Sequence, residues 1–223
     1  AWDSTWTATT SYYVESFNGN CPSPRTIVTV VVNPIPATTP SATPSTICFG
    51  GTSQLDAGTF LSGTLSTPFD QNNGSSATGF DIENITGSPI TLHFFSFQSS
   101  STAGTVGLQS IYYSTTPMNC TFPTNVTTAP GWILIGSVNT TSAGTVLGVP
   151  TVIPLDVNIT IPAGAKYAFA VGGALGQSYF TATTNCPTPV IRGTTAHLRV
   201  YQGFGGTLTG TIANRGWNGT VTY

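Results

Sequence analysis

A long succession of short segments that favour β-strands restricts the possible folds of this chain more than any other feature. From residue 47 to residue 223, stretches rich in Val, Ile, Thr, Tyr and Phe alternate with Gly, Pro, Asn and Ser, and no helical period is convincing. Short strands separated by turn residues are typical of a β-sandwich or jelly roll. The expected strands are 52–55, 79–85, 90–97, 110–114, 132–139, 151–161 in one or two pieces, 166–171, 179–183, 198–204 and 217–223.

A separate hairpin is expected near the N-terminus. Residues 11–17 and 25–33 favour strands, and Asn18-Gly19 between them is a strong turn signal. An isolated hairpin is at best marginally stable in water, so this one needs further strands from elsewhere. The residues expected to support strand pairing with a partner are Tyr12, Val14, Ile27, Val28, Val30 and Val32.

Proline separates this hairpin from the strand-rich domain. Residues 34–46, PIPATTPSATPST, carry prolines that fix φ and remove backbone donors, so we expect an extended, semi-rigid linker. The sequence therefore predicts an all-β chain in three parts. Residues 1–33 hold the hairpin, residues 34–46 form the linker, and residues 47–223 form a β-sandwich or jelly-roll-like domain.

The scarcity of charge excludes several function classes. Only 5% of the residues are charged and the net charge is −2, so no basic patch for nucleic acid or an anionic membrane can be assembled. No apolar run approaches the roughly 20 residues of a membrane span, so membrane insertion is not expected. Acid–base and nucleophilic catalysis need positioned titratable groups, and this chain supplies few. We therefore expect a protein that is not an enzyme and uses no cofactor.

Four cysteines bear on the compartment. Cys21, Cys48, Cys120 and Cys186 have no CxxC spacing and no nearby histidine, so a zinc site is not expected. Two disulfides or buried free thiols would both fit. The hydroxyl-rich, charge-poor composition favours export, and with it a Cys120–Cys186 disulfide in the main domain, which leaves Cys21–Cys48 as the residual pair.

Two acidic segments are candidate metal sites. Asp81 and Glu83 alternate along one expected strand and so point to one side, as a carboxylate pair or calcium site would need. The favoured alternative is that both face water while Phe80 and Ile82 face the core. Residues 70–74, DQNNG, are similar to a fragment of a calcium loop without its distal Glu, and a solvated turn is favoured there. No metal site is therefore predicted.

Histidines and aromatic residues are the other candidates. His93 and His197 have no nucleophile or metal partner nearby in the sequence, so no catalytic residue is predicted. Trp132 and Trp217 could stack on the apolar faces of sugar rings, although aromatic residues at strand ends more often belong to a core. Four tyrosines could extend such a platform: Tyr112, Tyr113, Tyr179 and Tyr201.

The N-terminal segment TSYYVESFNGNCPSPRTIVTVVVNPIPA resembles the last two strands of Ig-like modules in secreted Bacteroidota surface proteins, many of them type IX secretion cargo. Four stretches of the main domain are similar to a β-sandwich module of the same giant proteins: GFDIENITGSPITLHFFSF, GWILIGSV, ITIPAGAKYAFAV and RGWNGTVTY. The first strands of the Ig-like module are absent from the sequence. The matching hairpin residues are Tyr12, Val14, Gly19, Cys21, Arg25, Val28 and Val30.

The resemblance implies a secreted, extracellular or cell-surface protein with a structural or adhesive role. The missing strands would come from a neighbouring Ig-like module of a longer chain, or from the next copy in a filament joined by strand complementation. The alternative function is a carbohydrate-binding, lectin-like module with glycans as partners. Ser4, within Asp3-Ser4-Thr5, resembles the acceptor of Bacteroidota O-glycosylation.

Overall fold

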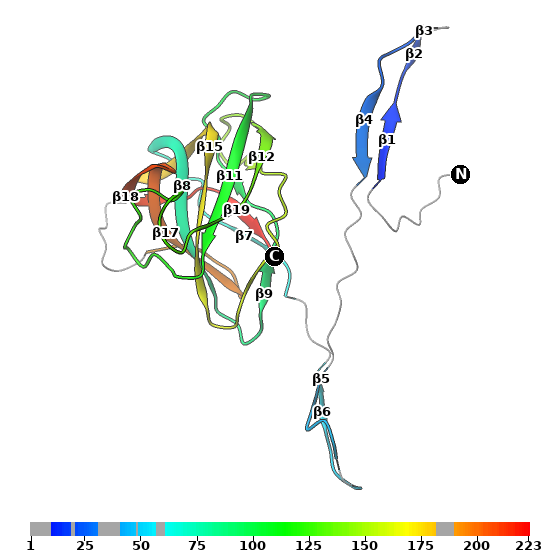
Figure 1. Cartoon of the computed structure of the whole chain (residues 1–223), viewed down its shortest axis with the longest axis vertical. Coiled ribbons are helices and arrows are strands. Elements are labelled where there is room, and N and C mark those ends of the chain that lie inside the picture. The colour runs from blue at the N-terminus through cyan, green and yellow to red at the C-terminus, as the bar shows by residue number, and fades with distance from the viewer. Residues whose placement is uncertain (1–9, 19–20, 31–40, 48, 57–60, 182–189) are drawn as a thin grey trace. The chain divides into compact units, whose positions relative to one another are not determined.

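The structure, a computed structural model, describes residues 10–18, 21–30, 41–47, 49–56, 61–181 and 190–223. The chain divides into unit 1, Ala1–Phe60, and unit 2, Leu61–Tyr223. All regular secondary structure in the described residues is β-strand, which confirms the predicted all-β class (Figure 1).

Unit 1 contains the predicted hairpin. Strand β1 (Thr10–Val14) pairs antiparallel with β4 (Thr26–Val30), and Tyr12 lies opposite Val28. Two short strands, β2 (Phe17–Asn18) and β3 (Cys21–Pro22), pair beyond it. The ladder is shorter than predicted, but its two strands and their antiparallel pairing are those expected.

A second hairpin lies in the region predicted to hold the linker, residues 34–46, and the first residues of the sandwich domain. Strand β5 (Ser41–Thr43) pairs with β6 (Gln54–Asp56), and unit 2 begins at Leu61 rather than at residue 47. The three residues of β5 fit between Pro40 and Pro44, where each backbone N–H is present. A residue before proline is driven toward extended conformations, which suits a strand, so the prolines bound β5 rather than prevent it.

The larger sheet of unit 2 has seven antiparallel strands. Its path runs β12-β11-β15-β18-β17-β16, and β8 pairs with both β15 and β17. Strand β15, predicted as two strands, is one 16-residue strand whose register shifts between Gly172 and Gln177. The bounds are β8 (Asn73–Asn84), β11 (Val106–Ser114), β12 (Ile133–Thr141), β15 (Lys166–Thr181), β16 (Ile191–Thr194), β17 (Leu198–Thr207) and β18 (Gly210–Gly216).

Short strands form the second layer. Strand β7 (Thr64–Ser66) pairs with β19 (Thr220–Thr222), which is bridged through Val221 to Phe95 beside β10 (Ser96–Phe97). Strand β10 pairs with β13 (Thr151–Val152), and β9 (Ile90–Leu92) pairs with β14 (Ile159–Ile161). Apolar side chains of both layers meet in one core, so unit 2 is sandwich-like, as predicted.

The main core is rich in aromatic rings. Phe80 on β8 stacks on Trp217 with ring centroids 4.0 Å apart, and Phe95 of the second layer meets both rings edge-on. Side chains alternate across a strand, so Phe80 and Ile82 fill this core while their neighbours on β8 point to the opposite face of the sheet.

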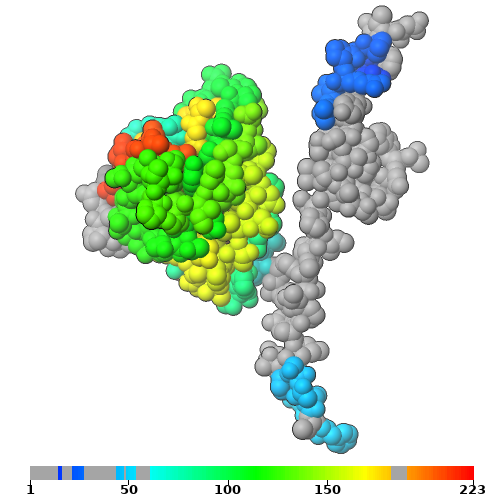
Figure 2. Space-filling view, viewed as in Figure 1, coloured from blue at the N-terminus to red at the C-terminus, as the bar shows by residue number. Residues whose placement is uncertain are grey.

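That opposite face is also covered. The connection between β11 and β12, residues 115–132, folds over it and packs Met118, Phe122 and Val126 against Ala168 and Phe204 of the sheet, which forms a smaller second core. In the space-filling view, the green part of the chain that includes this connection covers much of one face of unit 2 (Figure 2). The larger sheet is therefore buried on both faces around β8.

Candidate functional site

The hairpin of unit 1 carries the predicted partner-binding residues. Tyr12 and Val14 lie in β1, and Ile27, Val28 and Val30 lie in β4, in the register given above. Val32 lies outside the described residues. Within the described part of unit 1, β1 and β4 pair only with each other. One edge of each strand thus presents backbone N–H and C=O groups that a further strand could bind.

Charge in this hairpin is confined to one end. The Arg25 guanidinium lies 3.0 Å from the Glu15 carboxylate, just beyond the paired strands, and the Ser23 amide donates to the Ser16 carbonyl. The ladder strands themselves contain no charged residue. Ile27, in β4, is 58% exposed. The hairpin therefore offers an uncharged edge with an exposed apolar side chain.

Trp217 does not form part of a sugar-binding platform. It is only 1% exposed, and Phe80 covers one face of its indole ring at 4.0 Å. The indole is therefore a core residue, and this part of the glycan prediction is wrong. Tyr179 and Tyr201 are buried as well, while Tyr112 and Tyr113 are half-buried against the two cores.

Trp132, in contrast, lines a shallow pocket beside the second core. It is half-buried at the end of the β11–β12 connection, and the pocket has a volume of about 280 Å³. Hydroxyl groups of three residues lie among otherwise apolar side chains, so the pocket offers both an aromatic surface and hydrogen-bonding groups. Its lining is Ser114, Thr116, Pro117, Met118, Thr121, Phe122, Pro123, Ala129, Pro130 and Trp132.

Asp81 is buried, contrary to the expectation that it faces water. The connection that covers the outer face of the sheet places the amides of Met118 and Asn119 on its carboxylate, at 2.9 and 3.0 Å. Burial raises the pKa of Asp81 above its ordinary value, and the two amides oppose this shift. Asn119 and Cys120, directly after Met118, have positive φ, a backbone conformation that L-residues rarely adopt. The Asp81 carboxylate therefore holds an unusual turn in place.

Glu83 lies next to a tyrosine and two cations. It accepts a short hydrogen bond from the Tyr201 hydroxyl and lies 3.8 Å from Arg199. Burial, and then Glu83, raise the pKa of Tyr201. Lys166 lies 3.9 Å from the centre of the Tyr201 ring and donates to Asn119. Both carboxylates thus have protein partners, and no group of three metal-ligating residues occurs in the described part of the chain.

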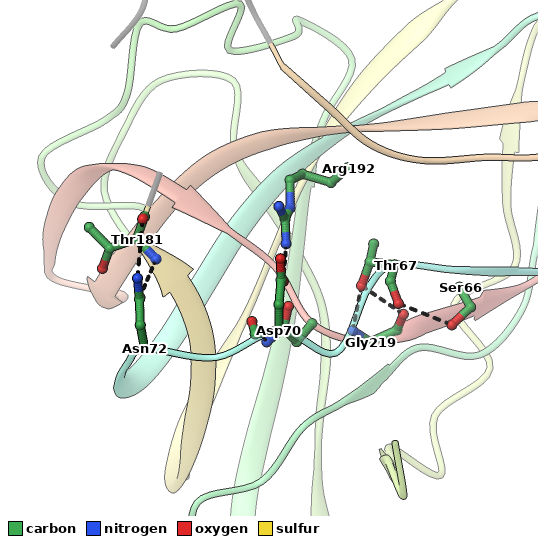
Figure 3. Close-up of polar contacts among 8 residues, drawn as sticks. Ser66, Thr67, Asp70, Asn72, Thr181, Arg192 and Gly219 are labelled. Atoms are coloured by element: carbon green, nitrogen blue, oxygen red, sulfur yellow. Dashed lines mark hydrogen bonds and ion pairs between the residues drawn. The ribbon is translucent and has the colours of Figure 1, made fainter. Parts of the chain in front are cut away.

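The segment similar to a calcium loop joins distant strands (Figure 3). Asp70 accepts a short hydrogen bond from Arg192 on β16, and its carbonyl accepts one from Asn218. The Asn72 side chain accepts from the Thr181 amide at 2.7 Å, at the end of β15. Residues 70–74 are all exposed, as expected for a solvated segment, but Asn73 and Gly74 begin β8 rather than forming a hairpin turn, and Asp70 and Asn72 also bind protein groups.

The histidines lie far from this segment and from each other in sequence. His93 lies 3.1 Å from the Asp156 carboxylate, and both side chains are about half-exposed. His197 contacts the Tyr223 hydroxyl at 3.2 Å. For neither imidazole does a described serine or cysteine side chain lie at hydrogen-bond distance, so the geometry assembles no nucleophile–base pair around them.

The remaining predictions concern cysteines, glycosylation and the membrane. Cys120 takes part in a disulfide, but Cys186 lies outside the described residues, so the predicted pairing stays a prediction. Cys48 and Ser4 also lie outside them. The described residues include no helix of the length and hydropathy that a membrane span requires.

Comparison with known proteins finds no match to this chain among family models, curated proteins or solved structures.

Proposed function

We propose that this chain is a non-enzymatic structural or adhesive module of an extracellular protein, attached to its neighbour by strand pairing through the β1–β4 hairpin. The observation that carries the proposal is that hairpin: two paired strands, with one edge of each strand unpaired within the described part of unit 1. Two strands bury too little surface to be stable alone, so partner strands would stabilise them.

The composition supports the same conclusion. A chain with 5% charged residues and many Thr and Ser suits a secreted protein that makes contacts through backbone and hydroxyl groups. The resemblance of the hairpin to the final strands of Bacteroidota Ig-like modules supports a neighbouring module, or a further copy of the chain, as the partner. In both cases the contact is β-augmentation, in which main-chain hydrogen bonds supply affinity.

Deletion of residues 10–30 tests this function. Electron microscopy of the native material is expected to show end-to-end contacts, and the deleted chain is expected to lose them. Thermal unfolding of unit 2 should not change, because no described residue of unit 1 belongs to its core. Isolated globular particles in the native material, or a unit 2 that unfolds without the hairpin, would contradict the proposal.

The pocket beside Trp132 favours a second candidate, binding of a glycan. A half-buried indole next to the hydroxyls of Ser114, Thr116 and Thr121 combines a stacking surface with hydrogen-bonding groups. Glycan-array binding by the whole chain that is lost in Trp132→Ala would support this candidate. Absence of binding to every glycan on the array would reject it.

A further inference from the structure

The two ends of the larger sheet differ in how far they are protected. Strand β16, at one end, has four residues, and its register with β17 shifts between Ile191 and Gly193. Arg192 packs over the Phe180 ring, and a Cβ on Gly193 would lie 2.9 Å from the Ser66 carbonyl of β7. This end is short, bulged, charged and in contact with the second layer. These are the features by which proteins block unwanted pairing at a sheet edge.

Strand β12, at the other end, is longer and uncharged, although it too carries a register shift, where Ile135 is left between the residues paired with Ile111 and Tyr112. It is nine residues long, contains neither proline nor a charged residue, and pairs along one edge with β11. No strand among the described residues forms a ladder with its second edge. Ile133 and Leu134 are each about half-exposed, and Val106 and Leu108 of β11 add exposed apolar surface on the neighbouring strand.

We propose that β12 is the acceptor edge for the hairpin of a second copy, with β4 as the strand that pairs with it. This inference rests on the proposed function and names the surface that the hairpin binds. Strand β4 spans about 17 Å and β12 about 30 Å at 3.4 Å per residue, so the whole of β4 fits along the edge. Neither strand carries a charge that would be buried by pairing.

The side chains at the two edges are also compatible. Ile27 of β4 is 58% exposed and can cover Ile133 or Leu134, while the Glu15–Arg25 ion pair lies beyond the ladder and stays in solvent. The hairpin and β12 are different surfaces, so contact between copies is head-to-tail. Repeated contact of this kind produces a fibre or a closed ring, and the smallest closed form is a dimer in which two copies exchange hairpins.

Three lysine substitutions in the full chain test the acceptor edge by sedimentation velocity over a range of protein concentrations. Ile133→Lys places a charge on β12, at a side chain that is 51% exposed. The controls are Ile212→Lys on β18 and Ile191→Lys on β16, which replace isoleucines of similar exposure, 51% and 48%. Wild type and both controls are expected to assemble, and Ile133→Lys to need at least about tenfold more protein, equivalent to about 1.4 kcal/mol.

Hydrogen exchange provides a readout that does not depend on a variant. Amides of residues 133–141 should exchange more slowly on assembly, while those of 191–194 should not change. A wild-type chain that stays monomeric, or an Ile133→Lys chain that assembles like wild type, would overturn the inference. If the deletion of residues 10–30 ends assembly and Ile133→Lys does not, the hairpin function stands and β12 is not its acceptor; if neither ends it, both proposals fail.

Discussion

Replacement of Asp81 by asparagine tests how the outer face of the sheet is closed. Each carboxylate oxygen accepts one backbone amide, from Met118 and from Asn119. Asparagine has the same shape but only one acceptor oxygen, so its NH₂ group would face one of these two amide donors. The turn that follows, with positive φ at Asn119 and Cys120, would lose part of what holds it in place.

The expected loss follows from this geometry. A buried amide left without an acceptor costs about 1–3 kcal/mol, and Asp81 is only 1% exposed, so water cannot replace the lost partner. Asparagine also removes the cost of burying a charge, which offsets part of the loss. We therefore expect Asp81→Asn to lower the free energy of unfolding of unit 2 by about 1–2 kcal/mol.

Urea denaturation followed by tryptophan fluorescence measures this loss, with Asp156→Asn as the control because Asp156 is about half-exposed. Burial raises the pKa of Asp81 in the folded state, so the folded state binds this proton more tightly than the unfolded state does. The stability that this proton binding provides is fully present below the unfolded-state pKa and is lost as pH rises through the folded-state pKa. The variant should lack this part of the pH dependence. A loss under about 0.5 kcal/mol, the range of exposed sites, or an unchanged pH profile, would refute the reasoning.

Two further substitutions test the contacts that join distant strands. Asp70→Ala leaves the Arg192 side chain, which is 10% exposed, without its carboxylate partner. Because Asp70 is 43% exposed, we expect the free energy of unfolding to fall by about 1–2 kcal/mol, less than for a fully buried pair. An unchanged urea midpoint would contradict this expectation. Trp217→Ala removes the ring stacked on Phe80 and should cost about 3–5 kcal/mol by the same assay, whereas a loss under about 1 kcal/mol would place the ring outside the core.

Much of the fold could be predicted because β-strands leave a local signature. Alternating apolar residues located β12 and β17 to within a few residues, and Asn18-Gly19 located the hairpin. The expected strand 90–97 is two strands, β9 and β10, and β8 begins earlier than predicted. The strands that were missed in unit 2, β7, β16 and β18, are short or rich in Gly, Thr and Asn. Their pairing depends on distant partners rather than on their own composition, so the local pattern could not reveal them.

The candidate sites were harder to predict because they depend on which face of a strand is covered. Alternation separated Asp81 from Phe80, but nothing local indicated that residues 115–132 would fold over the side that carries the carboxylate. The same information was missing for the two tryptophans, since both follow a Gly at the start of an expected strand. Only the packing separates Trp217 in the core from Trp132 at a pocket.

The pairing of β7 with β19 determines how unit 2 would respond to mechanical load. Gly63 and Tyr223 exchange two backbone hydrogen bonds, at 2.7 and 2.9 Å, and the ladder continues from there to Thr67 and Gly219. A force applied between residues 61 and 223 therefore pulls at one end of an antiparallel pair, so its bonds break one after another rather than together. In a pulling experiment with handles at these two positions, the first event would be the peeling of β19 from β7 at low force, before the seven-stranded sheet is loaded.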